Sequence, residues 1–262
     1  LYASIWTTNG SPLRALTEAL AARVQAAVGD PRVRVHAAMT YGEPALSKLL
    51  RQLEGQGINR VLVVPLYPQY SASTSGAVYD IVARYLLASR RAPDLRLVRD
   101  YCDRPAFLQA VADSVRAWRA QHGGADRLLF SFHGIPREYA DKGDPYPQCC
   151  AATAQGVAAQ LGLGGDGWEM AYQSRFGRQE WLRPYTDERL AAMPAEGVQS
   201  VQVVCPGFAV DCLETLEEIA VENRERFLHA GGRQYAYIPA LNDSAAHAAV
   251  LADLVKEHVA GW

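Results

Sequence analysis

The segment from Asp126 to Tyr146 constrains the fold more than any other part of the sequence. Its centre is a short, mostly apolar run, Leu128 to Phe132, which stops abruptly at His133-Gly134-Ile135-Pro136. This pattern predicts a buried parallel strand, because Gly and Pro cannot continue a ladder of backbone hydrogen bonds. Ligands bind at the carboxyl ends of strands in open α/β sheets, so His133 is placed for chemistry. A hydrogen-bonded loop histidine is the alternative interpretation.

A second strand with a Pro-Gly stop leads into an acidic helix. Val201 to Cys205 is followed by Pro206-Gly207-Phe208 and then by a helical pattern. Four acids fall on one face of that predicted helix, at Asp211, Glu214, Glu218 and Glu222. Asp211 can cap the helix, and acids in a first turn are favoured by the helix dipole. Four carboxylates in one stripe repel one another unless they are solvated or hold a cation. A solvated surface face is the alternative to a cation-binding role.

Helix and strand patterns alternate along the chain, which predicts an α/β fold with parallel sheets covered by helices on both faces. The expected helices are 12–28, 43–54, 71–87, 105–122, 148–161, 187–193, 211–229 and 244–259. The expected strands are 33–39, 61–65, 95–101, 126–132, 167–172, 198–205 and 234–237. Residues 60–71 and 200–211 echo each other in sequence, which indicates two similar lobes facing each other across a cleft. We place the lobes at 1–103 and 104–262, with the helix 244–259 packing back on the first lobe.

Composition excludes several classes of protein. The chain has 262 residues, 49% of them hydrophobic, and can bury a substantial core. Its net charge of −2 predicts no nucleic-acid partner and at most weak peripheral association with a membrane. No apolar run approaches the roughly 20 residues of a membrane span. Five cysteines, with Cys149 and Cys150 adjacent, do not form a disulfide framework, so we expect a reducing, cytoplasmic compartment.

Six ordered blocks of unusual residues cover nearly the whole chain. They are Pro65 to Ser71, Ser131 to Pro136, Gly143 to Tyr146, Tyr172 to Gly177, Pro206 to Leu216 and Tyr237 to Asn242. Together they resemble the ferrochelatase family, whose members insert ferrous iron into a porphyrin. The resemblance implies two Rossmann-like lobes of the class II chelatase type. The chain opens in a segment that the family carries further along, so we expect the family's usual N-terminal segment, with its first strand and Gly-Thr-Pro turn, to be missing.

The resemblance also implies a site and a reaction. His133 and Glu214 would be the catalytic, metal-contacting pair at the ring centre, and which of them is base and which is ligand is left open. Asp211, Glu218 and Glu222 would relay protons or metal. The porphyrin would contact Ser11, Tyr41, Tyr67, Ile135 and Trp181. The reaction would convert protoporphyrin IX and Fe²⁺ to protoheme with release of two protons, as the terminal step of heme biosynthesis.

Several alternatives and expectations accompany this interpretation. The substrate could be coproporphyrin instead of protoporphyrin, and the oligomeric state is not predicted. We expect no permanently bound cofactor and no iron-sulfur cluster, because no cysteine follows Cys212 in the region where some relatives carry cluster ligands. A sirohydrochlorin-type chelatase for cobalt or nickel is one alternative function. A tetrapyrrole-binding or metal-binding protein without turnover is another.

Overall fold

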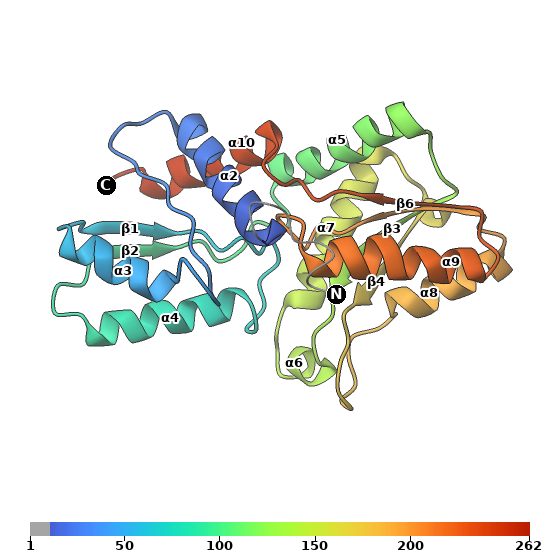
Figure 1. Cartoon of the computed structure of the whole chain (residues 1–262), viewed down its shortest axis with the longest axis horizontal. Helices are drawn as coiled ribbons and strands as arrows, with labels where there is room; N and C mark the ends of the chain where they lie inside the picture. Colours follow the sequence, from blue (N-terminus) through green and yellow to red (C-terminus); the bar gives the residue numbers. More distant parts are fainter. Residues whose placement is uncertain (1–10) are drawn as a thin grey trace.

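A computed structural model describes residues 11–262 and arranges them as two α/β lobes side by side (Figure 1). The first lobe has a short parallel sheet in which Arg60 pairs opposite Asp94. Its elements are α2 (Pro12–Val28), α3 (Leu46–Gly55), β1 (Arg60–Val63), α4 (Ser75–Ala88) and β2 (Asp94–Leu97). Within residues 11–262, no helix is both long enough and apolar enough to cross a membrane.

The second lobe contains a parallel sheet with the strand order β4-β3-β5-β6. Its strands are β3 (Arg127–His133), β4 (Trp168–Gln173), β5 (Ser200–Val204) and β6 (Gln234–Ile238). Its helices are α5 (Pro105–His122), α6 (Arg137–Asp141), α7 (Tyr146–Leu161), α8 (Thr186–Ala192), the π-helix η3 (Glu214–Asn223) and α9 (Arg224–His229), with short 3-10 turns at η1 (Gly165–Gly167) and η2 (Met193–Glu196). Parallel strands flanked by helices confirm the predicted fold class.

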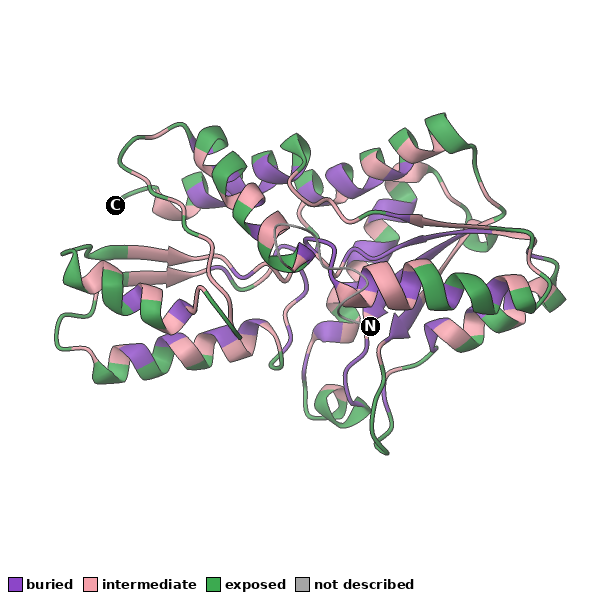
Figure 2. Cartoon of the chain, viewed as in Figure 1, coloured by how far each residue is buried: buried purple, intermediate pink, exposed green. Residues whose placement is uncertain are grey.

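The strand β3 lies in the middle of the second sheet and is buried on both faces (Figure 2). Leu128, Phe130 and Phe132 pack into one apolar cluster, whereas Leu129 packs into another on the opposite face. Alternating side chains of a strand point to opposite faces, so a strand covered by helices on both sides is mostly apolar on both faces. This is the physical reason for the mostly apolar run before His133, in which Ser131 is the one polar residue and is hydrogen-bonded.

The last helix, α10 (Ala245–Val259), packs against α2 of the first lobe and also touches β1 and α5. Leu251 and Leu254 of α10 belong to the same buried cluster as Leu20 and Val24 of α2. The chain thus returns to the first lobe after completing the second sheet. The predicted boundary between residues 103 and 104 stays a prediction.

Two predicted elements differ from the structure. The segment 33–39 is not a strand: Val33 and Val35 are partly buried between exposed residues, as a strand pattern requires, but among the described residues its only bridge joins Met39 to Ala45. The predicted single helix 211–229 is instead the π-helix η3 followed by α9. In η3 the carbonyl of Ile219 accepts a hydrogen bond from the Tyr235 hydroxyl at 2.6 Å, a long-range contact that supports the widened helix.

Candidate active site

His133 ends β3 and is held by the neighbouring strand. It pairs opposite Gln173, and the backbone N–H of Gly134 donates to the Gln173 carbonyl at 2.8 Å. Nδ1 of His133 lies 2.6 Å from the carbonyl oxygen of Gly134. A carbonyl can only accept a hydrogen bond, so Nδ1 carries a proton and Nε2 of the neutral ring keeps its lone pair. The imidazole is therefore oriented as a base or a metal ligand through Nε2.

A cavity of about 1600 Å³ lies between the lobes and is lined by both. Six of the residues predicted from the sequence line it: His133, Glu214, Tyr41, Tyr67, Ile135 and Trp181. The cavity exceeds the roughly 300–1,000 Å³ of ordinary ligand pockets because it continues into the first lobe. There it runs along β1 and the extended segment 33–40. The histidine and the acid that are about eighty positions apart in the sequence thus face one cavity, which has room for a flat macrocycle.

Aromatic side chains surround His133. The Trp181 ring lies 6.5 Å from the imidazole and the Phe208 ring 6.3 Å from it, measured between ring centroids. The indole N–H of Trp181 donates to the Phe176 carbonyl at 2.9 Å, which fixes the plane of the indole. Phe208 and Phe176 line the cavity but were not among the predicted site residues. Phe208 could have been found from its position directly after the Pro206-Gly207 stop.

Glu214 begins η3, and two ionisable side chains near it, Cys212 and Tyr67, have raised pKa values. Cys212, two residues earlier, also lines the cavity, and burial, with the nearby charge of Glu214, raises the pKa of its thiol above the ordinary value. Burial likewise raises the pKa of Tyr67, with a smaller contribution from Glu214. Both groups therefore stay protonated at neutral pH, and Cys212 does not offer a thiolate that would trap a soft metal ion.

Asp211 does not face the cavity with Glu214. It is 5% exposed, and its carboxylate accepts hydrogen bonds from the Thr215 hydroxyl at 2.9 Å, the Asn242 amide at 2.7 Å and the Tyr237 hydroxyl. It precedes the helix without accepting from a first-turn backbone N–H of η3, so the predicted capping role is wrong. The four acids expected in one stripe are divided among different surroundings.

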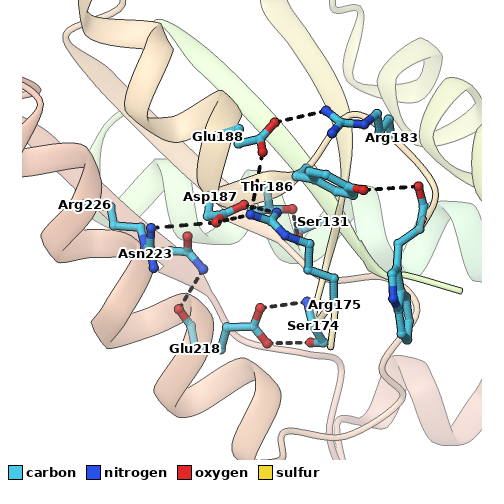
Figure 3. Close-up of polar contacts among 12 residues, drawn as sticks. Ser131, Ser174, Arg175, Arg183, Thr186, Asp187, Glu188, Glu218, Asn223 and Arg226 are labelled. Atoms are coloured by element: carbon cyan, nitrogen blue, oxygen red, sulfur yellow. Dashed lines mark hydrogen bonds and ion pairs between the residues drawn. The ribbon is translucent and has the colours of Figure 1, made fainter. Parts of the chain in front are cut away.

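Three further predicted residues lie off the cavity lining. Glu218 accepts from the backbone N–H of Ser174 at 2.8 Å and from the Ser174 hydroxyl (Figure 3). Glu222 is exposed. Ser11 is partly buried and precedes α2, whose first lining residue is Leu13. The relay role of Asp211, Glu218 and Glu222 and the porphyrin contact of Ser11 stay predictions. Within residues 11–262, no three His, Cys, Asp or Glu side chains converge as a group that could hold a metal ion.

The cysteines outside the cavity differ in reactivity. Cys149 is partly exposed, whereas Cys102, Cys150 and Cys205 are buried. A hydrogen bond from the Cys102 thiol lowers the pKa of Cys149, and the same contact, with burial, raises the pKa of Cys102. Burial raises the pKa of Cys150 and of Cys205. Cys149 is thus the thiol best placed to ionise.

Iodoacetamide is expected to label Cys149 before the other four cysteines of the folded protein, because only the thiolate reacts. The labelling rate, followed by peptide mass spectrometry, should rise with pH around a midpoint below that of a free cysteine. Cys102→Ala removes the hydrogen bond and should move that midpoint to higher pH, with labelling of the urea-unfolded chain as the control. Labelling of Cys205 as fast as Cys149 would contradict this assignment.

Comparison with known proteins identifies the family. The ferrochelatase family model matches residues 1–259. A ferrochelatase of Psychrobacter sp. (strain PRwf-1) is 49% identical, in an alignment covering 100% of this chain and 78% of the relative. One of Edwardsiella ictaluri is 52% identical, over 97% of this chain and 79% of the relative.

Solved structures similar to this chain share its fold at low sequence identity. SirB from Bacillus subtilis with Fe³⁺ has a TM-score of 0.67 and 12% identity, covering 96% of this chain and 92% of that structure. CbiX, described as the terminal enzyme for biosynthesis of siroheme in denitrifying bacteria, has a TM-score of 0.62 and 20% identity, covering 96% of both chains. The fold is therefore that of the chelatases, and the chain belongs to the ferrochelatase family.

Proposed function

We propose that this ferrochelatase inserts Fe²⁺ into a porphyrin bound in the interlobe cavity, with His133 and Glu214 at the ring centre. The observation that supports this most is that an imidazole and a carboxylate from different segments line one cavity with Trp181 and Tyr67. A planar ring with apolar faces and a polar, proton-bearing centre requires this combination. The expected substrate is protoporphyrin IX.

The chemistry of the pair suits metal insertion. Two pyrrole N–H protons must leave the porphyrin as Fe²⁺ enters, so the site needs a proton acceptor and weak metal donors. Imidazole nitrogen and carboxylate oxygen are both acceptable to ferrous iron, which is of borderline softness. Two protein donors leave most of the coordination sphere to water and to the porphyrin nitrogens, so the metal can be released into the ring. His133 Nε2 and Glu214 can each accept a proton or contact Fe²⁺.

The protein's other contributions are to bind and orient the macrocycle. Trp181 is 4% exposed and is fixed by its bond to Phe176, so it offers a rigid wall beside His133. Gly134 permits this approach, because a Cβ at that position would lie 3.1 Å from Trp181 and 3.0 Å from the Gln173 carbonyl. Trp181 and Phe176 carry no ionisable group, so this wall beside His133 stays uncharged. We propose that no resident cofactor takes part.

Anaerobic incubation with Fe²⁺ and protoporphyrin IX tests the proposal. We expect the free-base absorbance bands to be replaced by those of the metallated ring over many turnovers per protein chain. Parallel reactions with sirohydrochlorin and Co²⁺ test the alternative chelatase, and these should be slower. Stoichiometric porphyrin binding without a metallated product would instead favour a non-catalytic tetrapyrrole-binding protein.

A further inference from the structure

Gln173 joins the two segments that carry the proposed catalytic pair. It ends β4, is 3% exposed, and its backbone carbonyl accepts from the N–H of Gly134, the residue after His133. Its side-chain Nε2 donates to the backbone carbonyl of Glu214 at 3.0 Å. One residue thus contacts the chain beside the imidazole and the chain that bears the carboxylate.

Two donors to its oxygen atom set the orientation of the Gln173 side-chain amide. The Ser131 hydroxyl lies 2.7 Å from Oε1 and the Cys205 thiol lies 3.5 Å from it, both as donors. The Ser131 oxygen is in turn 2.8 Å from the Thr186 hydroxyl (Figure 3). Because Oε1 receives these donors, Nε2 must point toward Glu214, where a carbonyl is available. Both Oε1 and Nε2 of the buried amide therefore have hydrogen-bond partners. Removing the partner of either atom would leave a buried polar atom unpaired.

The next residue, Ser174, fixes the same helix at a second point. It has a φ of +64°, in the left-handed region, and both its N–H and its hydroxyl donate to the Glu218 carboxylate. Glu218 lies four residues after Glu214, on nearly the same side of η3. The end of β4 therefore binds η3 at two points, the backbone carbonyl of Glu214 and the side chain of Glu218. Two contacts fix both the position and the rotation of the helix that carries Glu214.

We infer that Gln173 is a positioning residue for metal insertion, which sets where Glu214 stands relative to His133. The inference rests on the proposed function of that pair. Gln173 itself does not line the cavity, so it acts through Glu214 and not on the porphyrin. Two reacting groups must be held within a fraction of an ångström for proton and metal transfer, and a misplacement of about 1 Å can cost on the order of 10²-fold in rate.

Three variants test the inference. Gln173→Glu keeps the shape and the acceptor for Ser131 but turns an oxygen toward the Glu214 carbonyl. Gln173→Met removes the donor without adding charge and keeps a similar volume. Ser131→Ala is the matched control, because it disturbs the same buried network but leaves the bond to Glu214. Circular dichroism and thermal unfolding check folding, kcat and KM are measured for Fe²⁺ and porphyrin, and porphyrin affinity is measured by fluorescence.

We expect both Gln173 variants to lose about 10- to 100-fold in kcat at pH 8 with little change in porphyrin affinity. The loss in Gln173→Glu should shrink as the pH falls, because a protonated carboxyl again donates to the Glu214 carbonyl. Gln173→Met should show no such recovery. If Gln173→Glu does not fold, the inference is tested by comparing the kcat and the thermal stability of Gln173→Met with those of Ser131→Ala.

Two results would overturn the inference. One is wild-type kcat in the folded Gln173→Met variant. The other is an equal loss of kcat and of thermal stability in Gln173→Met and Ser131→Ala, which would mean that the network is merely structural. A wild-type protein that does not metallate porphyrin at all would instead refute the proposed function, so the two failures are distinguishable.

Discussion

His133→Ala is expected to lower kcat for porphyrin metallation by about 10²–10⁴-fold, the range for loss of a positioned acid-base group. The reason is the orientation of the ring: Nδ1 is engaged by the Gly134 carbonyl, which leaves Nε2 to accept a proton or contact Fe²⁺. Porphyrin binding should persist, because Trp181, Tyr67 and Ile135 still line the cavity. Anaerobic absorbance assays give kcat, and quenching of porphyrin fluorescence gives the affinity.

The matched control for this variant is His229→Ala. His229 is exposed at the end of α9 and lies outside the cavity lining, so its removal should leave kcat unchanged. The contrast between two histidine variants separates a role in the site from a general effect of losing an imidazole. Full activity in His133→Ala would place the reacting centre elsewhere in the cavity.

Asp211→Ala is expected to cost about 3 kcal/mol or more in the free energy of unfolding, because each buried donor left unpaired costs about 1–3 kcal/mol. The donors concerned are the Tyr237 hydroxyl, the Asn242 amide and the Thr215 hydroxyl. Burial, with a smaller effect of the Asp211 charge, raises the pKa of Tyr237, so the phenol remains a donor at all ordinary pH values. Urea unfolding followed by circular dichroism measures the loss.

Glu222→Ala serves as the comparison for Asp211. Glu222 was predicted in the same acidic stripe but is exposed, so its removal should change the free energy of unfolding by no more than about 0.5 kcal/mol. If Asp211→Ala kept its stability and lost only activity, the carboxylate would belong to a relay and not to the frame that holds the start of η3.

The sequence predicts an element best where its ends carry residue types with strong positional preferences. The helices α2 and α5 have the predicted bounds, Pro12–Val28 and Pro105–His122. Each begins with Pro at the first helical position and is followed by Gly, which are the residues those positions favour. His133 was placed correctly at a strand end for a similar reason, since Gly134 and Pro136 terminate the strand.

What the sequence could not predict depends on contacts between distant segments. An α-helix and a π-helix have similar local patterns, and η3 is stabilised by donors from Gln173 and Tyr235 that lie outside it. The burial of Asp211 also depends on Asn242, which is thirty-one positions away. The segment 33–39 has the alternation of a strand, but within residues 11–262 it pairs only through the Met39–Ala45 bridge. Nothing in the local sequence marks Gln173 as a positioning residue. Only the hydrogen bonds of its side-chain Oε1 and Nε2 in the folded chain identify that role.

The contact between α2 and α10 has a consequence for how the protein forms during synthesis. The apolar side chains Leu20, Val24 and Val28 are made well before Leu251 and Leu254, which cluster with them but follow Leu20 by about 230 positions in the sequence. At about 5–20 residues per second, translation separates the two helices by on the order of 10–40 s. Throughout that interval the apolar face of α2 is exposed to water or to chaperones, so the nascent first lobe cannot bury this face until α10 has been made.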